Sequence, residues 1–171
     1  MLKQLMNRLI RNAPKASINP PSIPNAMISI LDSELNSPYV AAECKRRPKE
    51  ELNQFTMAFS CYILWLIKRS LESITAPEQT SLILKEIVES ITQRSWYQLG
   101  LFEKIWDSIQ DYLPTMRPGR HTGVLMPLVH VVLAANLAGC QLNNSNNPEF
   151  NVYAIALMKI IPEQVSSFMK T

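Results

Sequence analysis

The sequence is poor in glycine, which accounts for only 4 of its 171 residues. Nucleotide-binding α/β folds use glycine in phosphate-binding turns, and β-sandwiches use it in tight hairpins, so we expect neither class of fold. The sequence also contains no GxSxG, GxGxxG, P-loop or HExxH motif. These motifs would point to a nucleophile, a nucleotide or a metal ion. We therefore expect no catalytic residue, no cofactor and no enzymatic activity.

Charged residues are scarce too, at 18% of the chain against about 25% in an average protein. Hydrophobic residues make up 47%, which is enough for a core and excludes a disordered composition. The length fits one domain of the usual size. The formal net charge of +3 is too small to require nucleic acid as a partner.

Cysteine and histidine are few and widely spaced. Cys44, Cys61 and Cys140 form no CxxC pair, which favours free thiols in a reducing, intracellular compartment, with the cytoplasm as the first choice. The basic, acid-poor beginning of the chain leaves an organelle presequence open. His121 and His130 would point about 180° apart on one helix, so we expect no metal site. Three cations follow Cys44 and could lower the pKa of its thiol, but an ordinary, partly exposed cysteine is the simpler interpretation.

Apolar residues recur with helical periodicity almost throughout, and no segment alternates with the period of a strand. This pattern predicts an all-α fold, a single compact bundle of about seven helices. The expected helices span residues 22–36, 38–46, 48–69, 77–91, 95–113 and 123–139, and a last helix after a polar loop at 143–148 is kinked or restarted at Pro162.

Two segments, 55–67 and 124–138, are almost wholly apolar. Both are shorter than the span of about 20 residues that crosses a membrane. They predict two central helices, at 50–70 and 123–139, with the amphipathic helices around them. Small and aromatic residues of this region could also line an apolar pocket, although such a stripe is usually core. The pocket candidates are Tyr62, Trp65, Trp106, Ala134, Ala135 and Ala138.

The beginning of the chain differs from the rest. We expect an amphipathic helix at 1–12, which we call the arm, a proline-rich linker at 13–24 and the bundle domain at 25–171. The arm is basic, and no acidic residue precedes Asp32. A helix of this length is unstable alone in water, so its apolar face must dock on some surface. The docking residues are Leu2, Leu5, Met6, Leu9 and Ile10.

These features predict a non-catalytic interaction module, an adaptor or regulatory subunit. Its arm would dock on another protein or on a second copy of the chain, giving a homodimer if arms are exchanged. The alternative is a bundle that binds an apolar ligand or an anionic membrane surface. A lesser alternative is a subunit that binds nucleic acid. The basic residues available for such contacts are Lys3, Arg8, Arg11, Lys45, Arg46 and Arg47.

One acidic line completes the candidate features. Glu103, Asp107 and Asp111 are spaced so that their carboxylates share one helix face. Asp107 and Asp111 lie near the C-terminal end of the expected helix, where negative charge is unfavourable. We expect Arg117 and Arg120 to fold back and neutralise it.

Overall fold

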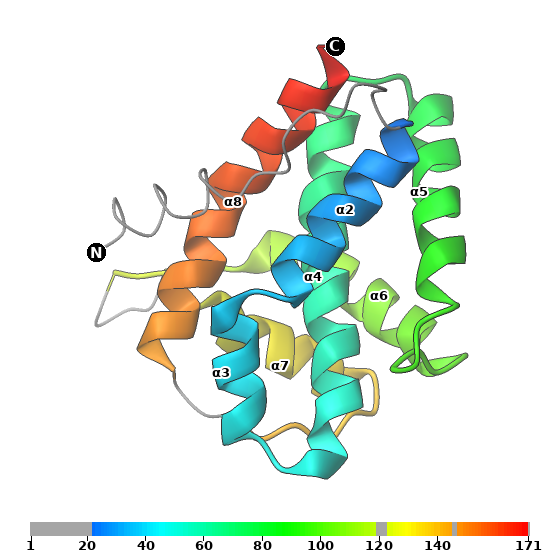
Figure 1. Cartoon of the computed structure of the whole chain (residues 1–171). Helices are drawn as coiled ribbons and strands as arrows, with labels where there is room; N and C mark the ends of the chain where they lie inside the picture. Colours follow the sequence, from blue (N-terminus) through cyan, green and yellow to red (C-terminus); the bar gives the residue numbers. More distant parts are fainter. Residues whose placement is uncertain (1–21, 119–122, 145–146, 171) are drawn as a thin grey trace.

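The computed structural model describes residues 22–118, 123–144 and 147–170, and within these ranges every regular element is helical. The described residues fold into a bundle of seven α-helices with two short 3-10 helices (Figure 1), which confirms the predicted all-α class. The arm and residues 13–21 lie outside the described residues. The α-helices are α2 (Ile23–Leu35), α3 (Pro38–Arg46), α4 (Leu52–Glu72), α5 (Pro77–Ile91), α6 (Leu101–Tyr112), α7 (Pro127–Leu137) and α8 (Pro148–Met169), and the 3-10 helices are η1 (Lys49–Glu51) and η2 (Leu113–Thr115).

Local capping signals set where several helices begin. The side chains of Ser22, Ser37 and Asn147 each accept a hydrogen bond from a backbone N–H in the first turn of α2, α3 and α8. A proline at the start of each of these helices has the right φ and no N–H to leave unpaired. The predicted bounds of α3 are confirmed. The linker was expected to reach residue 24, but Pro24 lies in the first turn of α2.

Helix α4 is the centre of the bundle, as predicted. It contacts α2, α5, α6, α7 and α8, and every residue from Met57 to Ile67 is buried. Aromatic side chains join its first half to α8, where Phe59 packs edge-on against Phe150 with 5.0 Å between ring centroids. In Figure 1, α4 runs behind α2 and between α8 and α5.

Helix α7 is less central than its composition predicted. It packs against α6, α4 and α8, so residues such as Val131 and Ala135 are buried. Leu133 and Leu137 instead remain 37% and 73% exposed. The helix is shorter than the expected 123–139, and it turns an apolar edge towards solvent.

Helix α6 begins later than predicted. Ser95 was expected to cap it, but its first residue is Leu101 and Leu99 is left 86% exposed. The Glu103 carboxylate accepts a hydrogen bond of 2.6 Å from the N–H of Gly100, and Gly100 takes a φ of 84°. Glycine adopts this conformation without strain, which fixes the start of the helix here.

Helix α8 runs without interruption through Pro162, where a kink or restart was expected. Proline there removes one intrahelical hydrogen bond, the one that the carbonyl of Met158 would accept. Met158 and Pro162 line a surface groove of about 310 Å³ between α4 and α8. Among the described helices, none is long and apolar enough to cross a membrane.

Candidate interaction surface

Helices α6 and α7 lie side by side and form the first candidate surface. The Ser108 hydroxyl on α6 donates a hydrogen bond of 2.6 Å to the backbone oxygen of Ala134 on α7. One turn further, the ring of Tyr112 lies 5.6 Å from the ring of His130. The pairs run in opposite directions along the chain, so the two helices are antiparallel.

An apolar edge follows from this packing. His130, Leu133 and Leu137 share one side of α7 because residues three, four or seven apart on a helix are neighbours. Since His130 faces Tyr112, the two exposed leucines lie along the edge of α7 that adjoins α6. Leucines this exposed on a helix that is otherwise apolar suggest a contact surface.

An acidic edge lies on α6 beside it. Asp107 and Asp111 directly precede Ser108 and Tyr112, which contact α7, and both aspartates are exposed. Within the ranges that the structure describes, neither makes an ion pair. The exposed side of this helix pair, made by Asp107, Asp111, Leu133 and Leu137, is called the α6–α7 surface below.

The expected neutralisation of the acidic line is not observed for Arg117. Its guanidinium donates instead to the backbone oxygens of Pro114 and Met116, and Arg120 lies outside the described residues. Glu103, the third acid of the line, is used locally. Its carboxylate accepts hydrogen bonds from the Tyr97 hydroxyl and the Gly100 N–H.

These bonds set the pKa values of the pair. Partial burial alone would raise the pKa of Glu103, but the hydrogen bonds from Tyr97 and Gly100 lower it. The same bond to Glu103 raises the pKa of Tyr97 to about 12. Glu103 is therefore a helix cap, and it leaves two aspartates for a partner.

The predicted basic contact at Lys45, Arg46 and Arg47 divides into two parts. Lys45 and Arg46 are exposed at the end of α3. For Arg47 the predicted contact with a partner is wrong, because its side chain is only 2% exposed. Its Nε donates to Glu43 Oε1 at 3.1 Å, and its Nη1 donates to Glu51 Oε2 at 2.9 Å. Two acids neutralise this guanidinium, so it is unavailable to a partner.

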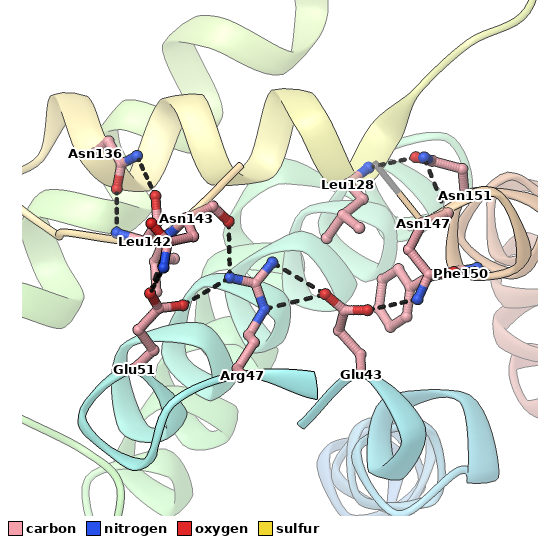
Figure 2. Close-up of polar contacts among 10 residues, drawn as sticks. All are labelled: Glu43, Arg47, Glu51, Leu128, Asn136, Leu142, Asn143, Asn147, Phe150 and Asn151. Atoms are coloured by element: carbon pink, nitrogen blue, oxygen red, sulfur yellow. Dashed lines mark hydrogen bonds and ion pairs between the residues drawn. The ribbon is translucent and has the colours of Figure 1, made fainter. Parts of the chain in front are cut away.

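The same buried cluster fastens the loop between α7 and α8 (Figure 2). Glu51 Oε1 accepts a hydrogen bond of 2.7 Å from the Asn143 side chain, and Glu43 accepts one from Asn147. The Asn136 side chain pairs with both backbone groups of Leu142. We call Glu43, Arg47, Glu51, Asn143 and Asn147 the buried polar cluster. Its members bind one another, although Nη2 of Arg47 has only the ion pair of 3.1 Å to Glu43 and no hydrogen bond among the described residues. This is the arrangement of a structural clamp.

Sequence reasoning missed this clamp although a signal for part of it exists. Glu43, Arg47 and Glu51 are each four positions apart, a spacing typical of ion pairs on one helix face. The asparagines of the loop are distant in sequence, so their part could not be read from local spacing. The cluster borders an open groove of about 550 Å³ next to Glu50, Gln54 and Gln141.

The candidate pocket residues fill the interior. Tyr62, Ala134 and Ala135 are fully buried, and Trp65 is 4% exposed. The Tyr62 hydroxyl donates a hydrogen bond of 2.6 Å to the backbone oxygen of Ala154. Trp106 and Ala138 are partly buried and pack against the core. These residues serve as core, which was the simpler interpretation.

The remaining reactive groups are unremarkable in their surroundings. All three cysteines are free. Burial raises the pKa of the Cys44 thiol, and Glu43 raises it further against the opposing effect of Arg47. A lowering of this pKa by the nearby cations is therefore wrong, and Cys44 is the partly exposed cysteine of the simpler interpretation. Across residues 22–118, 123–144 and 147–170, no group of three or more His, Cys, Asp or Glu side chains could hold a metal ion.

Comparison with known proteins adds no relative: no family model, no curated protein and no solved structure matches this chain.

Proposed function

We propose that the chain is a non-catalytic helical interaction module, an adaptor or regulatory subunit, whose arm docks on another protein or on a second copy. The observation that carries the proposal is a pair of apolar edges without an assigned partner. One is the leucine-rich face of the arm, and the other is the exposed edge of α7 at Leu133 and Leu137. The arm is basic, whereas the exposed charges of α6 beside the α7 edge are Asp107, Asp111 and Lys104.

The energetics of the arm support docking. Each leucine that it buries stabilises the complex by roughly 1.5–3 kcal/mol. Holding a short helix in one conformation costs free energy, because such a helix is unstable alone in water. Several apolar side chains buried together offset that cost. The arm thus behaves as a ligand for a groove and not as an independent folding unit.

We place the protein in a reducing, intracellular compartment, with the cytoplasm as the first choice. Three free cysteines support this placement, because unpaired and buried thiols are typical of such compartments.

The membrane alternative rests on a different property of the arm. Lys3, Arg8 and Arg11 can contact anionic headgroups while the leucines enter the interface. Nucleic-acid binding is weaker as an alternative because Arg47 is neutralised by Glu43 and Glu51. Lys45 and Arg46 then remain as the exposed cations at the end of α3.

Photo-crosslinking of the full-length chain in cells separates these possibilities. A photoreactive phenylalanine derivative at Leu5 should give discrete protein adducts, and Leu2→Asp with Leu9→Asp should abolish them. Lys45→Gln with Arg46→Gln is the matched control, since it changes exposed cations of the bundle and should leave the adducts unchanged. Adducts to lipid alone, or protein adducts that survive Leu2→Asp with Leu9→Asp, would overturn the proposal.

A further inference from the structure

We propose that the arm of a second copy of this chain docks on the α6–α7 surface, so that two chains exchange arms. This inference rests on the proposed function, and it names the partner and the site. It assigns a role to Leu133, Leu137, Asp107 and Asp111, which serve neither the core nor the helix cap.

The apolar match comes first. Leu133 and Leu137 are one helical turn apart and 37% and 73% exposed, so they present an apolar edge about 6 Å long at 1.5 Å per residue. In a helical arm, Leu5 and Leu9 have the same separation. Two leucine pairs in the same register can interdigitate along their whole length.

The charge match is independent of the apolar match. Asp107 and Asp111 border the leucine edge on α6 and have no ion pair among the described residues. Arg8 and Arg11 lie on the arm away from its apolar face, and the arm contains no acid. Arginine is the residue best suited to pair with carboxylates at an interface. Lys104 lies one turn before Ser108 on α6, at the Leu137 end of the edge. It repels arginine there, so it orients the arm with its arginines towards the aspartates.

The linker favours a second copy over the same chain. Residues 13–21 contain Pro14, Pro20 and Pro21, and proline favours an extended backbone over one that folds back on itself. That point is Ser22, the cap of α2. Helix α2 begins near the ends of α4 and α8, whereas α6 and α7 lie towards the other half of the bundle (Figure 1).

Reciprocal exchange also closes the assembly. Each chain supplies one arm and one α6–α7 surface, so a pair of chains leaves neither unmatched. Such isologous dimers are the commonest closed oligomers, and exchange of an element between copies is a route to them.

The test is the mass of the full-length protein in solution, measured by light scattering and by analytical ultracentrifugation over a wide range of concentration. The wild-type chain should be a dimer. Leu133→Asp with Leu137→Asp should give a monomer of unchanged helical content, because both side chains are exposed. Leu82→Asp with Leu99→Asp is the matched control, since these leucines are 65% and 86% exposed elsewhere on the bundle, and it should remain dimeric.

Two further variants test exchange itself. A chain with Leu5→Asp and Leu9→Asp should be monomeric. Mixed with the Leu133→Asp, Leu137→Asp chain, it should form a heterodimer, because one intact arm meets one intact surface. Arg8→Glu with Arg11→Glu should also break the dimer, and adding Asp107→Arg with Asp111→Arg should restore it.

The outcomes separate this inference from the function on which it rests. A monomeric wild-type chain, or a Leu133→Asp, Leu137→Asp chain that stays dimeric, overturns arm exchange. If Leu5 of such a monomer still crosslinks to a different protein, the interaction-module proposal stands and only the identity of its partner changes. If Leu5 gives no protein adduct, or an adduct only to its own chain, both proposals fail.

Discussion

Arg47 and Asn143 lie 96 positions apart in the chain, and Nη1 of Arg47 donates a hydrogen bond of 2.9 Å to the backbone oxygen of Asn143. The same guanidinium bonds Glu43 and Glu51 and lies 4.5 Å from the centroid of the Phe55 ring. The end of α3 is thereby tied to the loop that leads into α8. This relationship makes the buried polar cluster a determinant of the fold, and it predicts a large effect of mutation.

Replacing Arg47 with alanine should lower the free energy of unfolding by about 3–5 kcal/mol. The reason is that two buried carboxylates lose the cation that compensates their burial. Urea denaturation followed by circular dichroism measures the change. Arg46→Ala is the matched control, because its neighbouring guanidinium is exposed and surface substitutions change stability by about 0.5 kcal/mol or less. Equal and small effects of the two variants would contradict a stabilising role of the cluster.

Glu34 gives the protein a pH dependence of known sign. Its side chain is buried, and burial raises its pKa, although the hydrogen bond of 2.7 Å from the Tyr153 hydroxyl opposes this. The folded chain therefore binds the proton more tightly than the unfolded chain does. The contribution of Glu34 to stability consequently increases as the pH falls through its raised pKa towards the ordinary value of 4.5.

The variant Glu34→Gln should remove that contribution, since an amide does not titrate. Denaturation at about pH 7 and about pH 5 measures the difference. In the wild type the acidic condition should add more stability, or remove less, than in Glu34→Gln. The exposed Glu86→Gln should follow the wild type. A Glu34→Gln chain with the same pH profile as the wild type would show that Glu34 does not titrate in this window.

The start of α6 supports a third prediction. Gly100 has a φ of 84°, and a Cβ atom added there would meet no other atom within 4 Å. Gly100→Ala should therefore destabilise the chain through backbone strain alone, by about 1–2 kcal/mol. Its neighbour Leu99 is 86% exposed, so Leu99→Ala should have almost no effect in the same thermal melts. A Gly100→Ala chain as stable as the wild type would mean that the positive φ is not required.

Local signals explain which elements the sequence predicts correctly. The start of α3 follows from Ser37 and Pro38, whose capping and φ preferences act within one turn. The predicted start of α6 was wrong because the sequence contains two possible N-terminal caps in this region. Ser95 is a good capping residue by type, but the pair of Gly100 and Glu103 makes the cap.

Tertiary partners explain what the sequence could not predict. The basic residues 45–47 look alike in the sequence, yet only Arg47 is buried, because Asn143 and Asn147 close the cluster from a distant loop. The apolar composition of α4 and α7 likewise predicted that both helices lie at the centre of the bundle. Only the packing of α6 and α8 decides that α7 keeps an apolar edge at the surface, at Leu133 and Leu137.

The pKa of His130, which lies on α7 beside the α6–α7 surface, can be measured and supports a further prediction. Burial lowers the pKa of its imidazole below the ordinary value of 6.5, and its Nδ1 has no hydrogen-bond partner among the described residues. The folded chain then binds this proton less tightly than the unfolded chain, so the contribution of His130 to stability is lost as the pH falls from 6.5 through its lowered pKa. Titration of the imidazole proton by NMR, with His130→Gln to assign the signal, should give a midpoint below 6.5.

The same titration responds to docking. His130 shares one side of α7 with Leu133 and Leu137, so an arm on these leucines buries the imidazole further and brings Arg8 and Arg11 near it. Both effects disfavour the charged ring. The midpoint in the wild-type protein should therefore lie below the midpoint in Leu133→Glu with Leu137→Glu, where the added acids and the loss of the arm both raise it. Leu133→Gln with Leu137→Gln removes the arm without adding charge, and a midpoint equal to that of the wild type in this variant would show that nothing covers the α6–α7 surface.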